Sequence, residues 1–243
     1  MAGVPRAIPG APPVHRGKPI IVVLLGSELR GALRQVAETV AASPSSLLGD
    51  ENEPSIGFEA LAETQLHMDC VFCAERLLHL PEAEVHSLQE SLRQVVASAA
   101  GAAAAPLTFA GFELFAPDKT WVVARFRVPE ALTTLRKTVW RACRERQVAY
   151  PDALWTPHIK IGRITGASRG RLNQMSCAGL APLAPQCCAQ PLGLALLGDR
   201  PEGARCDWDR ALSFSRELPE DHAPARTAGK SRGAELASRE VVA

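Results

Sequence analysis

The chain has 243 residues, of which 47% are hydrophobic and 22% are charged, proportions that are ordinary for a globular protein with a buried core. The 27 Lys and Arg nearly balance the 26 Asp and Glu, and a net charge of +1 argues against a broad nucleic-acid-binding surface but allows a local nucleotide site. No apolar run reaches the roughly 18–20 residues of a membrane span, so no contact with a membrane is expected.

The apolar periodicity predicts an order of strands and helices that does not alternate regularly. In chain order we expect a strand at 19–25, a helix at 28–42, a loop at 43–60, a strand at 65–73, a helix at 81–98, an Ala-rich connector to 105, a hairpin of strands 107–115 and 120–128, a helix at 129–145, a strand at 158–164, a short helix within 168–180, and strands at 192–197 and 208–215. Helices interleaved with a hairpin indicate an α+β fold.

The two ends of the chain differ in composition from its middle. Residues 1–17 are rich in Pro, and residues 216–243 are polar and contain no aromatic residue. We therefore predict flexible tails that flank one folded domain at 18–215. The N-terminal tail has no apolar core like that of a secretory signal, so a cytoplasmic or nuclear location is expected. Its basic character leaves organelle targeting open as an alternative.

Seven cysteines, an odd number, indicate reduced thiols rather than a disulfide framework. Cys70 and Cys73 have the spacing of a metal or redox pair. In a regular strand, however, their side chains would point to opposite faces, and no second such pair completes a zinc site. No metal site is expected.

The most informative pattern is a four-residue unit that occurs twice, beginning at His67 and at His158. Each unit reads His, apolar, polar, apolar on an extended segment. Strand alternation places His67 with Asp69 on one face and His158 with Lys160 on one face. The alternate residues, Leu66, Met68, Cys70 and Phe72 in the first copy, are predicted to face the core. Each strand would thus present two polar side chains on one face, while its other face is buried in the core.

The two units resemble the motifs of the 2H phosphoesterase superfamily, which includes 2′-5′ RNA ligase-like proteins and cyclic nucleotide phosphodiesterases. The similarity spans about residues 18–215 and is strongest at 155–164, where Pro precedes the His and Gly-Arg follows the strand. It implies two pseudo-symmetric lobes, antiparallel sheets that line a central cleft, and helices outside. His67 and His158 would project into that cleft as an acid–base pair that needs no metal or other cofactor.

Both motifs depart from the His-x-Ser/Thr pattern of that family. The third positions here are Asp69 and Lys160. Lys160 is expected to bind a phosphate oxygen as a cation, whereas the carboxylate of Asp69 would repel a phosphate. We predict that the two side chains pair across the cleft; the alternative is that both are solvated in an open groove. Arg163 and Trp155 are further candidates for substrate contact or for lining the cleft. Strand parity places Arg163 on the face opposite to that of His158, so a structural or edge role is expected as much as a contact with substrate.

The resemblance implies a metal-independent phosphodiesterase, acting on a 2′,3′-cyclic phosphate or a 2′-5′ linkage of RNA or a small nucleotide, and a monomer. The sequence leaves open which histidine is the acid. One alternative is a binding module of the same fold for nucleotides or RNA ends that has lost turnover, which Asp69 favours. Another is a structural partner protein with two coincidental histidines, which predicts no pocket between the lobes.

Overall fold

The computed structural model describes residues 19–48, 56–115, 119–151, 154–197 and 212–213. The two predicted tails lie outside these residues. None of the described helices combines the length and apolarity that a bilayer span requires.

The described strands form a single antiparallel sheet with the order β4-β5-β6-β3-β1-β7-β8, and β2 pairs with β6. Their bounds are β1 Ile20–Leu25, β2 Gly57–Ala60, β3 Met68–Phe72, β4 Thr108–Phe115, β5 Trp121–Arg127, β6 His158–Thr165, β7 Pro191–Leu197 and β8 Leu212–Ser213. The helices are α1 Ser27–Ala42, α2 Pro44–Leu47, α3 Glu82–Ala103, α4 Glu130–Glu145 and α5 Arg169–Leu172, with 3-10 turns η1 Glu63–Gln65, η2 Glu75–His79 and η3 Ala178–Leu183. The expected α+β fold with antiparallel pairing is confirmed.

The sheet consists of two halves that meet at one point. One half contains β2, β4, β5 and β6, and the other contains β1, β3, β7 and β8; Met68 of β3 pairs with Ile159 of β6 between them. The unit β1-α1-β3 in one half corresponds to β5-α4-β6 in the other, because each contains adjacent antiparallel strands connected through a helix.

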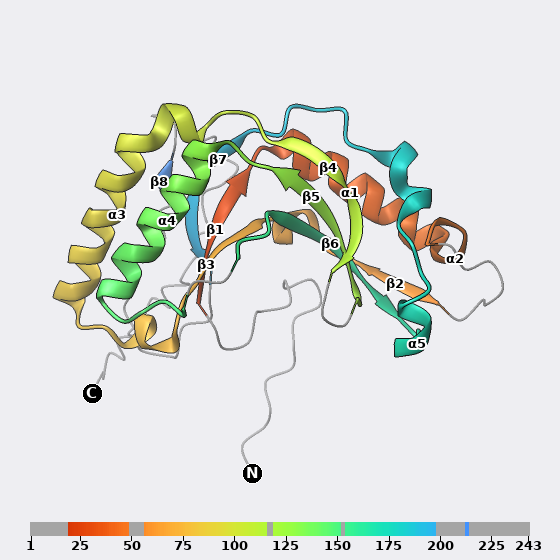
Figure 1. The fold of residues 1–243 in the computed structure, drawn as a ribbon, viewed down its shortest axis with the longest axis horizontal. Helices are drawn as coiled ribbons and strands as arrows, with labels where there is room; N and C mark the ends of the chain where they lie inside the picture. The colour runs from red at the N-terminus through yellow and green to blue at the C-terminus, as the bar shows by residue number, and fades with distance from the viewer. Residues whose placement is uncertain (1–18, 49–55, 116–118, 152–153, 198–211, 214–243) are drawn as a thin grey trace, which may run out of the picture.

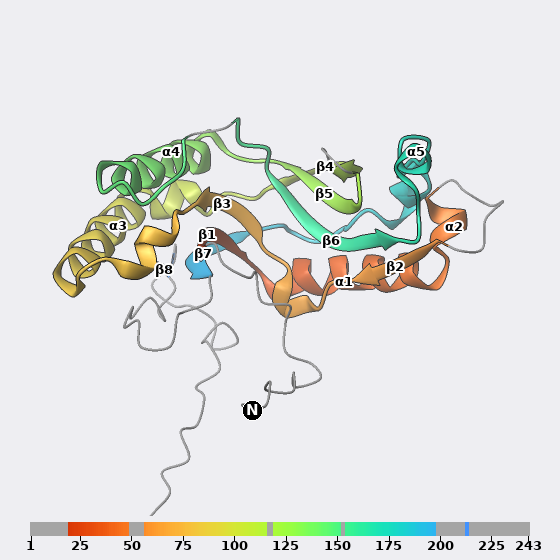
Figure 2. The ribbon, with the colours of Figure 1, turned by 90° about the horizontal axis from the view of Figure 1, so that it is seen from below.

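The helices lie on the outside of the two halves (Figures 1 and 2). Helix α1 packs on β2 and β6, whereas α3 and α4 pack on each other and contact β8 and β3, respectively. The apolar stripe of α1, predicted from its helical spacing, is buried at Leu29, Leu33, Val36 and Val40. Burial of such stripes is the main force that holds helices on a sheet.

The same irregularity interrupts both central strands. Opposite the regular β1, residue Cys70 of β3 is an extra residue, since Ile21 pairs with Val71 and Val22 with Asp69. Opposite β5, residue Ile161 of β6 is extra in the same way. A β-bulge of this kind reverses the side-chain alternation for the residues that follow it. The two bulges occupy equivalent positions, three residues after His67 and three after His158, which supports the predicted pseudo-symmetry.

Some predicted elements differ from the structure. The loop at 43–60 contains α2 and β2, and the Ala-rich connector continues α3 to Ala103, because Ala is the strongest helix former. The strand expected at 65–73 is shorter, since η1 precedes it and it begins at Met68. Of the last predicted strand, the described part is Leu212–Ser213.

Gly162 allows β2 to pair closely with β6. A Cβ added there would overlap the Phe58 ring and lie 2.7 Å from the backbone oxygen of Glu59. We expect Gly162→Ala to lower the free energy of unfolding by about 1–3 kcal/mol, as overpacking in a core does, measured by urea denaturation. Gly101→Ala, where nothing lies within 4 Å of the added Cβ, is the control and should not destabilise. Equal stability of the two variants would contradict this close approach.

Candidate active site

The pairing of Met68 with Ile159 brings the two repeated motifs side by side. In an antiparallel ladder, that register sets His67 across from Lys160 and Asp69 across from His158. Met68 and Ile159 are fully buried on the core side. The four polar side chains therefore share the opposite face of the sheet, as the alternation predicted. His67 directly precedes β3 rather than lying within it.

His158 is held in one tautomer and is almost fully buried. Its Nδ1 lies 2.6 Å from the backbone oxygen of Thr156, and since a carbonyl only accepts, Nδ1 carries the proton. In the neutral ring Nε2 then holds a lone pair. Within the described chain, Nε2 is buried and has no hydrogen-bond partner. The Phe115 ring stacks on the imidazole at a centroid distance of 4.0 Å and covers one of its faces. Because Nε2 itself is buried, a ligand reaches it only if neighbouring side chains move.

Burial lowers the pKa of His158 below its ordinary value. The hydrogen bond with Thr156 and the charge of Asp69 oppose this shift, whereas the cations Lys160 and Arg125 add to it. The ring is therefore neutral near neutral pH, and the lone pair of Nε2 can accept a proton once a ligand reaches this buried atom.

Asp69 bridges the two motifs. Its Oδ2 lies 3.4 Å from Nζ of Lys160, and its Oδ1 lies 3.4 Å from Nε2 of His67. The predicted pairing of Asp69 with Lys160 is thus confirmed, and the solvated alternative is wrong. Burial alone would raise the pKa of Asp69, but the hydrogen bond with His67 and the charge of Lys160 outweigh it and lower the pKa to about 2. The carboxyl group is ionised, and each of its oxygens has a partner: Lys160 for Oδ2 and His67 for Oδ1.

Trp155 and Arg136 support the backbone beneath these groups. The indole Nε1 of Trp155 donates to the backbone oxygen of Asp69 at 2.8 Å, and Nε of Arg136 donates to that of Cys70 at 3.1 Å. The Arg136 guanidinium lies 5.5 Å from the centroid of the Trp155 ring. The segment before β6 and helix α4 are thereby tied to β3 at its bulge.

Arg163 lies on the face of His158 and Lys160, so the predicted parity is wrong. After the bulge at Ile161, Arg163 pairs with Trp121, and the Trp121 ring centroid lies 5.7 Å from Nζ of Lys160. A regular strand would have turned Arg163 to the core. Arg163 is exposed.

A cavity of about 460 Å³ opens beside His158. Asp69, His158, Lys160 and Trp155 line it; His67 and Arg163 do not. The structural-partner interpretation predicted no pocket between the lobes. This cavity is lined by β3 of one half of the sheet and by β4 and β6 of the other, which contradicts that interpretation. The other lining residues are Cys70, Phe72, Phe115, Arg136, Trp140, Tyr150, Pro151, Leu154 and Thr156.

Sequence reasoning missed most of the cavity wall. Phe72 was expected to face the core, but the bulge at Cys70 turns it outward, where it is 57% exposed. The available signal was the uninterrupted apolar run from Cys70 to Phe72, which breaks strand alternation. Phe115 and Tyr150 come from segments distant in sequence, and nothing local assigns them to the site.

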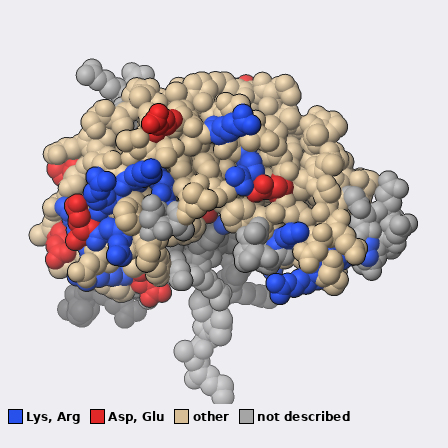
Figure 3. Space-filling model, viewed as in Figure 1, with Lys and Arg blue, Asp and Glu red and all other residues tan. Residues whose placement is uncertain are grey.

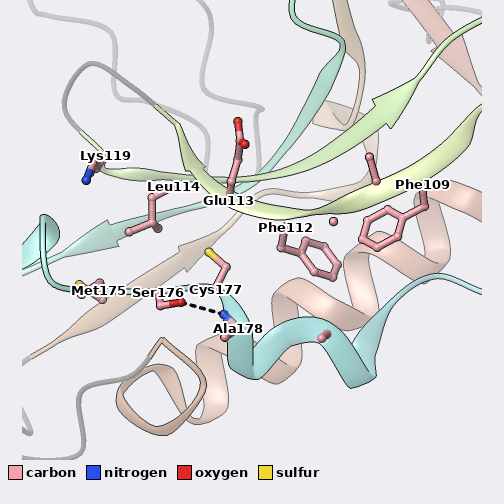
Figure 4. Close-up of a pocket in the computed structure, with 12 residues that line it drawn as sticks. Phe109, Phe112, Glu113, Leu114, Lys119, Met175, Ser176, Cys177 and Ala178 are labelled. Atoms are coloured by element: carbon pink, nitrogen blue, oxygen red, sulfur yellow. Dashed lines mark hydrogen bonds between the residues drawn. The ribbon is translucent and has the colours of Figure 1, made fainter.

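A second, larger cavity of about 640 Å³ lies along β4, which ends the sheet order, next to residues 175–181. Figure 4 shows Phe109 and Phe112 toward one end, Met175 toward the other, and Glu113 pointing away from the 175–178 segment. None of the predicted site residues lines it. Its size alone therefore does not make it the reactive site.

The thiols near the site are buried, and their environment disfavours the thiolate form. Both Cys70 and Cys73 are buried in the core, because the bulge brings them to the same side rather than to opposite faces. Burial raises the pKa of Cys70 to about 12, and a hydrogen bond with Cys143, together with burial, raises the pKa of Cys73. Among the described residues, no group of three or more His, Cys, Asp and Glu could hold a metal ion.

No protein-family model matches the chain, and no curated protein is significantly similar to it. Among solved structures, the protein TT0787 of Thermus thermophilus is 17% identical with a TM-score of 0.47, over 74% of this chain and 87% of that one. A phosphoesterase is 13% identical with a TM-score of 0.42, over 74% and 86%. Escherichia coli LigT, solved with 3′-AMP, is 12% identical with a TM-score of 0.41, over 74% and 86%. These scores, all below 0.5, establish neither a common fold nor a common activity.

The low pKa of Asp69 predicts how stability depends on pH. A carboxyl whose pKa falls from 3.8 to about 2 on folding stabilises the fold above its unfolded pKa, and this is lost as pH falls through the folded pKa. We expect Asp69→Asn to cost about 2 kcal/mol at neutral pH, and the difference to shrink as pH falls from about 4 toward 2. Urea denaturation over a pH series measures this.

Glu38→Gln, which removes an exposed ion pair with Arg34, is the control and should change stability little at any pH. A destabilisation by Asp69→Asn that stays constant across the acidic range would contradict the assigned pKa.

Proposed function

We propose that the protein is a metal-independent phosphodiesterase and that this site is its active site. Its substrate would be a 2′,3′-cyclic phosphate or a 2′-5′ linkage of RNA or a small nucleotide. The observation that carries the proposal is the pairing that sets His67, Lys160 and His158 on one face, with Nε2 of His158 neutral and unpartnered among the described residues. A base, a proton donor and a cation are the groups that such a displacement requires.

The geometry suggests a division of roles. Nε2 of His158 takes the proton of a water molecule, whose oxygen attacks phosphorus, and the bond from phosphorus to the leaving ribose oxygen breaks. His67, whose Nε2 lies 3.4 Å from Oδ1 of Asp69, acts as the proton donor and gives its Nε2 proton to that oxygen. Nζ of Lys160 stabilises the charge on the non-bridging oxygens. Each ring then exchanges one proton with water, so that the original protonation states are restored.

Asp69 favours a second candidate, a nucleotide- or RNA-end-binding module without turnover. The carboxylate already occupies both Lys160 and His67, at 3.4 Å each. An incoming phosphate has to displace Lys160 from this contact and meets the negative charge of Asp69. Nucleotide binding by the wild type without detectable hydrolysis would favour this second function over the first.

Removing either histidine tests the catalytic proposal. We expect His67→Ala and His158→Ala each to reduce hydrolysis of 2′,3′-cyclic nucleotides by about 10²–10⁴, the usual value of general acid–base catalysis. The assay is product chromatography, with circular dichroism to verify folding. His86→Ala, on the exposed face of α3, is the matched control and should keep full activity. Unchanged activity in both site variants would overturn the assignment.

The lowered pKa of His158 predicts the pH dependence of the wild type. As the base, His158 has to be deprotonated, so kcat/KM should rise with pH, with a midpoint below 6.5, the ordinary imidazole value. Activity would thus persist at lower pH than an exposed histidine allows. Replacing Arg125, a cation that lowers this pKa, by Gln should move the midpoint upward. A wild-type midpoint at or above 6.5 would be inconsistent with His158 as the base.

A further inference from the structure

The exposed apolar surface of the described residues is concentrated in one place. Their exposed large hydrophobic residues are Phe72, Tyr150 and Leu154, at 57, 39 and 95%. All three line the cavity beside His158. Exposed apolar side chains gathered at one opening indicate a binding surface, since scattered single ones would need no explanation.

Aromatic rings form much of this wall, and the N–H groups of its two indoles are already engaged. Nε1 of Trp140 donates to the backbone oxygen of Tyr150 at 2.9 Å, and Nε1 of Trp155 donates to the backbone oxygen of Asp69. The indole N–H groups are therefore not available to a ligand as donors, and the two indoles contribute ring surface to the cavity lining. Ring faces bind flat aromatic groups by stacking.

Next to this wall, α4 carries a row of cations. Arg136 and Trp140 line the cavity. At 100° per residue, the neighbouring arc of about 60° around the helix, on its solvent side, contains Lys137, Arg141 and Arg144. All three are exposed. We call them the basic face of α4; Figure 3 shows Lys and Arg side chains gathered over this helix.

Acidic side chains of the described residues do not pair with the basic face. Over the described ranges, none of Lys137, Arg141 and Arg144 forms an ion pair, in contrast to exposed cations such as Arg34 and Arg93. Arg144 donates to the backbone oxygen of Ala149 at 3.1 Å. That bond and the bond from Trp140 to Tyr150 fix the aromatic wall next to the basic face.

We propose that a single-stranded RNA segment binds across this cavity and the basic face of α4. Bases stack on the aromatic wall, phosphates lie along Lys137, Arg141 and Arg144, and one end of the strand reaches Lys160 and His158. This placement of the end rests on the proposed function. Stacking rings beside a cationic row is the arrangement that binds single strands, and a contact of a few nucleotides needs no excess of positive charge over the whole chain.

Fluorescence anisotropy with a labelled RNA of about eight nucleotides ending in a 3′-hydroxyl tests the proposal without turnover. We expect this RNA to bind at least about tenfold more tightly than a mononucleotide, with strong salt dependence. Arg141→Glu should weaken RNA binding and reduce the slope of log K against log salt by about 1. It should leave hydrolysis of a cyclic mononucleotide unchanged.

Phe72→Ala, which removes one stacking ring, should weaken RNA binding by about five- to a hundredfold. The matched control is Arg169→Glu, the same charge reversal at an exposed residue of α5, and it should bind as the wild type does. Equal affinity for the RNA and the mononucleotide would overturn the proposal. Equal effects of Arg141→Glu and Arg169→Glu, or displacement of the RNA by an oligoglutamate at equal charge concentration, would do so as well.

Failure of this proposal is distinguishable from failure of the proposed function. RNA binding that persists in a chain unable to hydrolyse cyclic nucleotides supports the binding surface and removes the catalytic role. Hydrolysis of cyclic mononucleotides without length-dependent RNA binding contradicts the surface and leaves the catalysis intact.

Discussion

The contact between Met68 and Ile159 is the constraint on which the site depends. It is the pairing through which the two halves of the sheet meet, and both side chains are fully buried beneath it. Because the pairing is antiparallel, it sets each histidine beside the polar residue of the other motif. A slip of one residue would send the histidines toward the core. Burial of two apolar side chains thereby fixes the relative placement of the reactive ones.

Asp69 shows how stability and anion binding oppose each other at this point. Its carboxylate satisfies Lys160 and His67 in a partly desolvated setting, and its pKa of about 2 reflects that stabilisation. The same contacts use the cation that a phosphate would need. A chain with a hydroxyl group at position 69 alone would leave Lys160 uncommitted but would lose the ion pair. The electrostatic cost of admitting an anion is therefore built into the resting site.

The proposed RNA segment would engage a surface that is chemically distinct from the polar motifs. The motifs supply a base, a proton donor and a cation, whereas the cavity wall and α4 supply aromatic faces and fixed positive charge. Stacking and phosphate contacts are tolerant of sequence, so such a surface would favour an extended single strand without selecting particular bases. The reacting phosphate and the rest of the ligand would be recognised by different interactions.

The sequence by itself predicted the elements whose pattern is local: the strand at β1, the stripe of α1, the β4–β5 hairpin, and the shared face of His67 with Asp69 and of His158 with Lys160. It also predicted the pairing of Asp69 with Lys160, since opposite charges stand at equivalent positions of the repeat. The tertiary structure decided what depends on partner strands. A bulge exists only relative to a neighbouring strand, so the outward turn of Phe72 and the position of Arg163 could not be read from alternation. The burial of His158 under Phe115 likewise arises from a contact between distant segments, and that burial, not the residue type, makes the ring a neutral base.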